Sequence, residues 1–379
     1  GINEVLAAGE CGDGEGVLEI MPDGFGFLRA EHYLAGRKDI YISNAQVKRF
    51  GLRTGDYVVG KTRKQRDNDR FAAMLYITDV NGKSAEEPIK RPLFEELTPI
   101  YPKKRIVLSG KDSGMTLKLI DVLSPIGFGQ RALIVSPQRA GRMNLLVEIS
   151  KVLTEKYPDV TQMMLLIDQR PEDVTEISEK VRAEVVSSSF DEPPESQTRA
   201  SELLLERAMR LAECGGNVVL LLDSITRLVY AYNNVAPATA RTTPSGLVAG
   251  AMNKPKRLFG AARNLKQGGS LTVIATAFSE TGNAIDEAVL KELKGTSNME
   301  AQLAVSSDKR VYPALVAENC ATRHDELLLT EKEIAAGKRL RDMLADPAQI
   351  ELVCAILEKT RDTKDLAERF DGFMEMLGK

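Results

Sequence analysis

The sequence predicts an α/β protein in two parts: a small all-β barrel, followed by a larger domain built on a parallel sheet. Between residues 14 and 80, short runs of alternating apolar residues are separated by turn signals, which is typical of a small barrel. Beyond residue 104, fully apolar runs alternate with amphipathic stretches, which is typical of a parallel sheet covered by helices on both faces. Residues 81–104 hold four prolines and little periodicity, which indicates a linker.

Composition excludes several classes of protein. The chain has 379 residues and a formal net charge of -3. Its share of hydrophobic residues, 43%, is typical of globular proteins. We expect no membrane-spanning helix, because no run of about 18 apolar residues occurs, and the first residues lack the pattern of a signal peptide. The four cysteines are scattered and only two histidines occur, so we expect neither a disulfide framework nor a zinc site. A cytoplasmic protein is the simplest interpretation.

The first part should form five strands, at residues 17–20, 24–28, 39–42, 57–61 and 71–75. Five short strands in about 60 residues favour a barrel of the OB type. Aromatic side chains alternate with basic ones along it, which is what single-stranded nucleic acid binds: Phe25, Phe27, Tyr41 and Phe71 lie among Arg29, Lys38, Lys61 and Arg70. The alternative is that the aromatic rings form the core and the cations a solvated rim. We favour binding, because glycines beside Phe25 and Phe27 leave their face of the strand open.

The larger domain should contain parallel strands at residues 132–135, 163–167, 184–186, 218–222 and 271–275. Ligands of such sheets bind at the carboxyl ends of the strands. The first strand leads through the loop 136–143 into a helix-like run at residues 144–153, the context that a phosphate-binding loop requires. A lysine and a hydroxyl normally complete such a loop, but these positions carry Arg142 and Met143. On the eight loop residues alone, an ordinary strand–turn–helix is the simpler interpretation.

Two further strand ends carry carboxylates. Asp223 follows the fourth apolar run and precedes Ser224, the arrangement of an aspartate that holds Mg²⁺ directly or through water. Aspartate is also a common helix cap, and the sequence does not separate the two roles. Asp191 and Glu192 follow the third run, in a loop where a carboxylate could orient an attacking water. Glu-Pro is equally common in surface loops that have no such role.

Several of these stretches together resemble the Rho transcription termination factors. They occur in the family's order over nearly the whole chain, and they include the Gly-Phe-Gly-Phe of residues 24–27 and the Leu-Asp-Ser-Ile-Thr-Arg of residues 222–227; the others are residues 39–41, 52–56, 124–131, 190–193, 256–264 and 294–300. The resemblance implies an OB-fold, cold-shock-like RNA-binding domain at 14–80 and a RecA-like ATPase domain with C-terminal helices at 105–379. It implies that residues 1–13 are the remnant of a preceding helical part.

The same resemblance implies an activity. Such a chain forms a homo-hexameric or related ring that binds pyrimidine-rich single-stranded RNA and moves along it by hydrolysing ATP with Mg²⁺. It releases transcripts from the RNA polymerase elongation complex. The RNA-binding positions on the barrel are then Phe25, Phe27, Arg29, Asp39, Tyr41, Asp69 and Phe71. Two loops that grip RNA inside the ring match residues 243–250, with Gly246, and the residues Lys294, Gly295 and Thr296.

Roles at the nucleotide also follow from the resemblance. Glu192 falls on the water-activating glutamate and Asp223 on the Mg²⁺ aspartate. Arg323 falls on the arginine finger given to the neighbouring subunit's ATP, and Arg310 on a second arginine at the subunit interface. The residues expected to contact ATP are Pro137, Gln138, Arg139, Ala140, Gly141, Arg142, Met143 and Asn144, with Tyr312 on the adenine.

The departures from the family pattern concentrate at ATP. The family's loop reads Pro-Lys-Ala-Gly-Lys-Thr, whereas both lysines are arginines here and the threonine is Met143. Arginine keeps the positive charge but is bulkier and forked. A thioether is a poor ligand for Mg²⁺, which prefers oxygen. We therefore expect nucleotide to bind weakly and hydrolysis to be slow or absent.

Two interpretations stay open. The first is a working Rho-type motor and terminator. The alternative is a Rho-like RNA-binding oligomer whose ATP hydrolysis is impaired or lost, and which acts as a regulatory or binding protein. A rotary ATPase subunit or a recombinase shares the core sheet but lacks the Gly-Phe-Gly-Phe barrel, so we rank that class low. RNA-stimulated phosphate release separates the first two.

Overall fold

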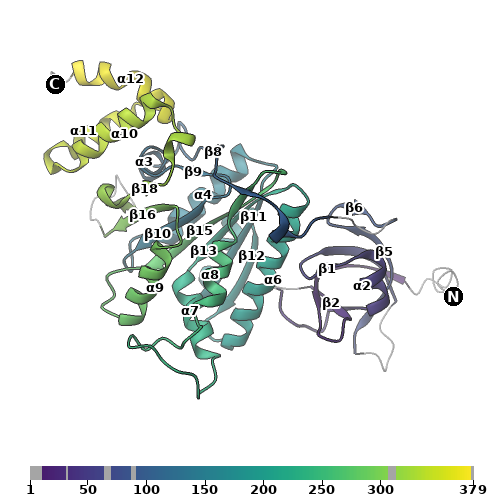
Figure 1. Cartoon of the computed structure of the whole chain (residues 1–379). Coiled ribbons are helices and arrows are strands. Elements are labelled where there is room, and N and C mark those ends of the chain that lie inside the picture. The colour runs from purple at the N-terminus through teal and green to yellow at the C-terminus, as the bar shows by residue number, and fades with distance from the viewer. Residues whose placement is uncertain (1–10, 31–32, 64–69, 87–90, 306–312, 377–379) are drawn as a thin grey trace.

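The computed structural model describes residues 11–30, 33–63, 70–86, 91–305 and 313–376. The small barrel lies at one end of the molecule, the large sheet with its helices lies in the middle, and the last three helices lie at the opposite end (Figure 1). Both predicted parts, the five-stranded barrel and the parallel sheet covered by helices, are confirmed. Within these described ranges, no helix is both long enough and apolar enough to cross a membrane.

The barrel closes because its third and fifth strands pair with each other. Its strands are β1 (Cys11–Ile20), β2 (Gly26–Arg29), β3 (Ile40–Ile42), β4 (Tyr57–Arg63), β5 (Ala72–Val80) and the short β6 (Lys83–Ser84). They follow the order β3-β2-β1-β4-β5-β6, with the additional pairing of β3 and β5. Helix α2 (Asn44–Phe50) follows β3 and begins with a capping box at Ser43. β1 begins three residues before the expected boundary at residue 14, and β6 extends the barrel into the predicted linker.

Six neighbouring strands of the larger sheet are parallel. They are β10 (Arg131–Ser136), β11 (Thr161–Gln169), β12 (Glu184–Ser189), β13 (Asn217–Asp223), β15 (Ser270–Phe278) and β16 (Met299–Ala304), in the order β12-β11-β13-β15-β10-β16. Five of the six are the predicted apolar runs. The sixth, β16, was not predicted, because its residues alternate between buried and partly exposed instead of forming an apolar run.

Short strands extend this sheet at its edges. They are β7 (Pro99–Ile100), β14 (Arg263–Leu265), β17 (Ala314–Leu315) and β18 (Ala321–Thr322), while β8 (Arg105–Ile106) and β9 (Ile126–Gly127) pair separately. β7 pairs with β14, so part of the predicted linker is an ordered edge of the sheet. The described part of the chain also holds four short 3₁₀ helices, namely η1 (Phe94–Glu96), η2 (Ala317–Asn319), η3 (Asp325–Leu327) and η4 (Pro347–Gln349).

Helices cover the sheet on both faces. One core involves α3 (Met115–Leu123), α4 (Arg142–Lys156), α5 (Pro171–Lys180), α10 (Glu331–Leu344), α11 (Ile350–Glu358) and α12 (Thr363–Met376). The other involves α6 (Pro194–Glu213), α7 (Ile225–Asn234), α8 (Asn253–Gly260) and α9 (Ala284–Lys294). Ala132 and Ile134 of β10 face the first core, and Leu133 and Val135 face the second. This alternation explains why the strand is apolar on both sides.

A buried ionic cluster joins the barrel to the larger domain. Glu213, at the end of α6, lies 3.2 Å from a terminal nitrogen of Arg53, 3.1 Å from Nε of Arg91 and 2.8 Å from a terminal nitrogen of Arg210. Arg91 also lies 2.6 Å from Asp56. Arg53 and Asp56 belong to the barrel and Arg91 to the linker, so the cluster fastens three segments together. Burial raises the pKa of Glu213, and the three arginines oppose that rise.

Candidate nucleotide site and RNA-binding surface

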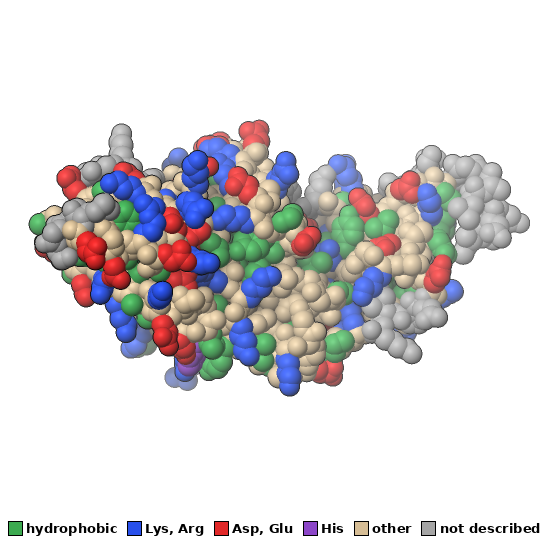
Figure 2. All heavy atoms as spheres, turned by 90° about the horizontal axis from the view of Figure 1, so that it is seen from above, with side chains coloured by type: hydrophobic (Ala, Val, Ile, Leu, Met, Phe, Trp, Pro, Cys, Tyr) green, Lys and Arg blue, Asp and Glu red, His purple; other side chains and the backbone are tan. Residues whose placement is uncertain are grey.

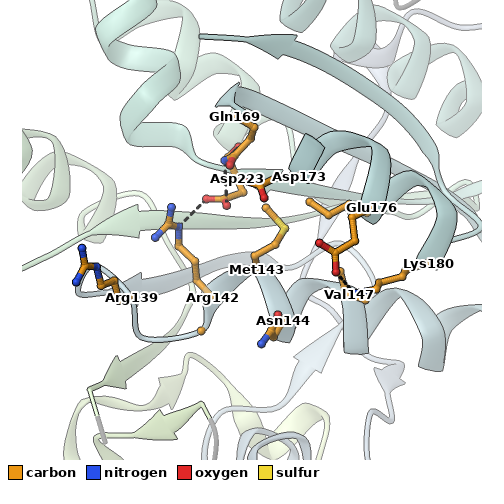
Figure 3. A pocket seen from close by; sticks show the side chains of 12 residues that line it. Arg139, Arg142, Met143, Asn144, Val147, Gln169, Asp173, Glu176, Lys180 and Asp223 are labelled. Carbon is orange, nitrogen blue, oxygen red and sulfur yellow. Dashed lines mark hydrogen bonds and ion pairs between the residues drawn. The ribbon is translucent and has the colours of Figure 1, made fainter. Parts of the chain in front are cut away.

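The loop after β10 turns sharply and opens a cleft at the carboxyl edge of the sheet. Arg139 and Gly141 both adopt left-handed backbone conformations, with φ of 63° and 84°, and α4 begins at Arg142 directly after them. Glycine adopts this conformation without strain. The cleft has a volume of about 450 Å³, and its lining residues are Arg139, Gly141, Arg142, Met143, Asn144, Val147, Gln169, Asp173, Glu176, Ile177, Lys180 and Asp223 (Figure 3). The predicted strand, loop and helix therefore border a cleft that also reaches the end of β13.

Arg142 and Asp223 form an ion pair on the floor of this cleft. Nε of Arg142 donates to Oδ1 of Asp223 at 2.9 Å (Figure 3). Thr276 Oγ1 donates to the same oxygen at 2.7 Å, and Gln169 Nε2 donates to Oδ2 at 3.2 Å. The Asp223 side chain is 1% exposed, so its charge is buried, and each of its two oxygens accepts at least one hydrogen bond. The guanidinium carbon of Arg142 also lies 4.7 Å from the centre of the Phe278 ring.

Three of these neighbours were missed by sequence reasoning. Gln169 ends β11 and Phe278 ends β15, so the rule that ligand sites lie at strand ends points to both. Thr276 lies inside a fully buried strand, where a hydroxyl needs a partner. The signal was present in each case, but the partners are distant in sequence: Asp223 lies more than fifty residues from Gln169 and from Thr276, and the partner of Phe278 is Arg142.

The residues at the predicted metal position do not fit a Mg²⁺ ion. Mg²⁺ requires oxygen ligands in near-octahedral geometry. Both oxygens of Asp223 already accept hydrogen bonds, and a guanidinium carries its charge against one of them. Met143 offers a thioether that packs against the apolar core, and it extends toward Asp173 on α5 (Figure 3). Among the residues that the structure describes, no group of three His, Cys, Asp or Glu side chains could hold a metal ion.

The other predicted nucleotide residues lie apart from this cleft or at its margin. Asn144 is exposed at the cleft, one residue beyond Met143. Glu192 lies in the loop after β12, where its Oε2 accepts a hydrogen bond from Ser188 at 2.7 Å, and it does not line the cleft. Arg310 and Tyr312 lie outside the described residues.

Arg323 lies at the opposite end of β10 from the cleft. Its backbone N–H donates to Asn298 at 2.9 Å, and Asn298 in turn donates to the carbonyl of Arg131, the first residue of β10. The nucleotide loop follows the last residue of β10, roughly 17 Å along the strand at about 3.3 Å per residue. Burial lowers the pKa of Arg131, and the charges of Arg263 and Arg323 lower it further. The exposed Arg323 therefore contributes to a positive region away from its own chain's cleft.

The predicted RNA-binding aromatic residues gather on the outside of the barrel. The ring of Phe27 lies 5.8 Å from Phe25, 6.0 Å from Tyr41 and 5.0 Å from Phe71, measured between ring centres. The barrel core is instead built from aliphatic side chains, including Leu18, Leu28, Ile42, Val58 and Ile77. Tyr41 is 37% exposed, and the other three rings are partly exposed. The arrangement therefore favours the binding interpretation over the aromatic-core alternative.

A charged pair borders this aromatic cluster. Arg29 is buried, and it contacts Asp39 at 2.5 Å and Glu19 at 2.6 Å. Its guanidinium carbon lies 5.2 Å from the centre of the Phe27 ring. A cleft of about 910 Å³ adjoins them, lined by Phe27, Arg29, Ala35, Gly36, Arg37, Asp39, Arg70 and Phe71. Asp69, the remaining predicted residue of this surface, lies outside the described part of the chain.

The two loops predicted to grip RNA lie near opposite ends of helix α9. Gly246 adopts a left-handed φ of 88°, in a tight turn where the Thr243 hydroxyl donates to the Leu247 carbonyl at 2.9 Å. A Cβ atom on Gly246 would lie 3.7 Å from Ile285 on α9. Lys294 is the last residue of α9, with Gly295 and Thr296 directly after it. Helix α9 thus contacts the first loop and carries the second.

Charge over the rest of the surface is mixed. Basic and acidic side chains are interspersed over the face of the larger domain seen in Figure 2. This matches the small formal net charge of -3. Attraction for an anionic ligand must therefore come from local sites such as the barrel cleft, since the global field is weak.

Two family descriptions match the chain. Residues 14–86 match the Rho termination factor RNA-binding domain, and residues 116–320 match the nucleotide-binding domain of the ATP synthase alpha/beta family. Among solved structures, an ATPase from the type III secretion system of pathogenic bacteria has a TM-score of 0.63 at 18% identity, covering 82% of this chain and 94% of that chain. An ATP synthase subunit from Nanoarcheaum equitans has a TM-score of 0.62 at 18% identity, covering 77% and 83%. These likenesses show the fold of the nucleotide-binding domain.

Curated relatives match over almost the whole length. Transcription termination factor Rho of Pseudomonas aeruginosa is 45% identical over 371 residues, which cover 96% of this chain and 88% of the relative. The factor of the same name from Escherichia coli K12 is 44% identical over 376 residues, covering 98% and 89%. The barrel, the nucleotide domain and their order along the chain agree with these matches. The chain belongs to the Rho transcription termination factor family.

Proposed function

We propose that this chain is a Rho-type transcription termination factor that binds nascent single-stranded RNA and releases transcripts from the RNA polymerase elongation complex. The observation that carries the proposal is the cluster of partly exposed aromatic rings beside the buried Arg29–Asp39 pair on the barrel. Aromatic faces stack with bases, and a base stacked in this way contributes about 1–3 kcal/mol. The proposed location of the protein is the cytoplasm, where transcription takes place.

The proposed RNA preference is for pyrimidine-rich sequences. The cleft beside Phe27 and Phe71 is bordered by Arg29 and Asp39, which present a donor and an acceptor to the edge of a stacked base. Asp39 Oδ1 is buried and has no hydrogen-bond partner among the described residues. Such an oxygen needs a donor, and the exocyclic amino group of cytosine is one.

The proposed assembly is a homo-hexamer or a related ring. Arg323 lies at the far end of β10 from its own nucleotide cleft, so it suits donation to the nucleotide of a neighbouring subunit. The loop at Gly246 contacts helix α9, and the loop at Lys294 follows it. In the proposed ring both loops would grip RNA inside the ring. Arg310 and Glu192 keep the roles implied by the resemblance, at the interface and beside the attacking water.

Nucleotide use follows from the family, and the proposed nucleotide is ATP, bound by the residues of the loop after β10. Translocation along RNA driven by ATP is the function of a complete motor of this kind. The second candidate function, an RNA-binding regulator with impaired hydrolysis, is favoured by one observation, namely the ion pair of Arg142 and Asp223. Since Mg²⁺ does not fit the donor set of Asp223 and Met143, we assign no step to it.

An in vitro transcription experiment tests the main proposal. Stalled elongation complexes carrying a long pyrimidine-rich transcript are incubated with the full chain, with and without ATP, and released RNA is separated from bound RNA. Release that needs both the protein and ATP supports the motor. RNA binding without ATP-dependent release supports the regulator, and no binding to the transcript contradicts both.

A further inference from the structure

We propose that the guanidinium of Arg142 takes the place of a divalent metal ion on Asp223, so that this site binds ATP without Mg²⁺. The inference rests on the proposed function, because it concerns the same nucleotide site. It deepens that proposal by naming the form of the nucleotide that binds, which is the metal-free polyphosphate.

The buried carboxylate of Asp223 needs a positive partner. A buried charge without a counter-ion is strongly unfavourable. In a metal-dependent site the ion supplies that charge, whereas here Nε of Arg142 supplies it at 2.9 Å. Thr276 donates a second hydrogen bond to the same oxygen, and Gln169 donates one to the other oxygen. Asp223 is therefore neutralised and hydrogen-bonded by the protein's own side chains.

Arg142 is held in place by more than this one bond. It is the first residue of α4, directly after the left-handed Gly141, so its backbone is fixed by the turn. Its guanidinium carbon lies 4.7 Å from the ring centre of Phe278, which is itself 5% exposed. The Arg142 side chain is 21% exposed, so it remains open to a ligand on one side. Because this cation is already held in position, it loses little further conformational entropy when phosphate binds.

The guanidinium can contact Asp223 and a phosphate at the same time. Arginine carries five N–H donors, and the bond to Asp223 uses the one on Nε. The dashed line in Figure 3 joins Asp223 to Nε, so the two terminal nitrogens take no part in this bond. Within the described residues, these nitrogens donate no hydrogen bond. Their fork matches the spacing of phosphate oxygens, so one side chain can bridge carboxylate and phosphate, as a metal ion does elsewhere.

Met143 fits the same account. The residue at this position normally contributes the hydroxyl that binds Mg²⁺. The thioether of Met143 packs against the apolar core and lines the cleft beside Arg142. The two replacements therefore act together, since one supplies the positive charge and the other removes the oxygen ligand.

Calorimetric titration of the full chain with ATP tests the inference without relying on activity. One titration contains Mg²⁺ in excess and the other contains EDTA. We expect the two dissociation constants to agree within about threefold, because the charged contact of Arg142 is present in both. Binding that is tenfold or more tighter with Mg²⁺ would overturn the inference while leaving the nucleotide part of the proposed function intact. Absence of binding in both buffers would contradict both.

Variants separate the role of Arg142 from general charge. Arg142→Ala should weaken ATP binding in EDTA by roughly ten- to a hundredfold, the range of a hydrogen bond to a charged group. Arg227→Ala is the matched control, because Arg227 also lies over Phe278, at 5.3 Å, but pairs with Asp168 at 3.0 Å. An equal loss in both variants would contradict the specific role of Arg142.

A double variant tests the Mg²⁺ requirement of ATP binding directly, and it does not leave Asp223 without a positive partner. Arg142→Lys with Met143→Thr restores a compact ammonium and a hydroxyl oxygen. We expect ATP binding in this variant to become metal-dependent, at least tenfold tighter with Mg²⁺ than with EDTA. Binding that stays equal in the two buffers would show that the replaced residues do not decide the metal requirement. Circular dichroism spectra that match the unmodified chain confirm that each variant is folded.

Discussion

Nε of Arg142 lies 2.9 Å from Oδ1 of Asp223, at the point where the nucleotide loop meets the end of β13. The two residues are 81 positions apart in sequence, and the parallel order of β10, β15 and β13 brings them together. The pair places a fixed cation where a hydrolytic site of this family would need a metal ion. From this pair we predict a chemical consequence of the altered loop, which is slow hydrolysis with nucleotide binding retained.

Restoring the loop should restore turnover. We expect Met143→Thr combined with Arg142→Lys to raise RNA-stimulated ATPase activity by at least about 10²-fold, the size of one electrostatic contact in a transition state. The hydroxyl returns an oxygen ligand, and the smaller ammonium leaves room on Asp223. Steady-state phosphate release with saturating RNA measures the effect.

The single substitution Arg142→Lys should change the rate of ATP hydrolysis little. Arg142→Lys keeps the charge but leaves Met143 where an oxygen ligand is needed, so we expect activity within about tenfold of the unmodified chain. The same phosphate-release measurement applies. A full recovery in this single variant would show that the bulk of arginine, and not the missing hydroxyl, limits hydrolysis.

The aromatic cluster on the barrel should govern RNA affinity. Phe27 contacts three other rings, so Phe27→Ala should weaken binding of single-stranded pyrimidine RNA by about 1–3 kcal/mol. Tyr76→Ala is the matched control, because Tyr76 lies on β5 of the same barrel, is 52% exposed and belongs to no ring pair in the described structure. Filter binding measures both. Unchanged affinity in a folded Phe27 variant would remove the main argument for this surface.

The ionic cluster at Glu213 should hold the barrel against the larger domain. Replacing Glu213 with Gln leaves Arg53, Arg91 and Arg210 without their shared counter-ion, and the unfolding free energy should fall by about 3–5 kcal/mol. Urea denaturation checks this value. Lys180→Gln is the control, because its pair with Glu176 is exposed and should contribute less than about 1 kcal/mol. Similar losses in the two variants would contradict the role of the cluster.

Assembly should place nucleotide sites between subunits. Because Arg323 lies away from its own cleft, we expect an oligomer. Arg323→Ala should lower the ATPase activity that the Met143→Thr, Arg142→Lys variant recovers, without preventing ATP or RNA binding. Analytical ultracentrifugation in the presence of nucleotide and RNA determines the size. A protein that sediments only as a monomer under these conditions would count against the proposed ring.

Much of the fold follows directly from hydrophobic pattern. The apolar runs of β10, β11, β13 and β15 are buried on both faces, so a continuous apolar run identifies each one. β16 was missed because it lies nearer the edge and alternates, and β7 was hidden in a proline-rich stretch. Such edge strands form because neighbouring strands offer hydrogen bonds, which a local pattern does not reveal.

The site was predictable only in part. The rule on strand ends predicted Asp223, which lines the cleft, and the alternation of residues predicted the exposed face of Phe27; their roles stay predictions. The ion pair of Arg142 with Asp223 was not predicted, because the direction of the arginine depends on the distant ring of Phe278. Thr276 and Gln169 were missed for the same reason, since their importance lies in a shared partner that only the folded sheet brings near.

The most direct test of the central claim is the rate of RNA-stimulated phosphate release by the unmodified chain. Enzymes commonly turn over at about 10 per second, and the loss of one transition-state contact lowers the rate by about 10²–10³-fold. We predict a rate below about 0.1 per second with saturating ATP, Mg²⁺ and pyrimidine-rich RNA, in a protein that still binds ATP and RNA. A rate of several per second would contradict it, and would show that Arg142 and Asp223 support hydrolysis as they stand.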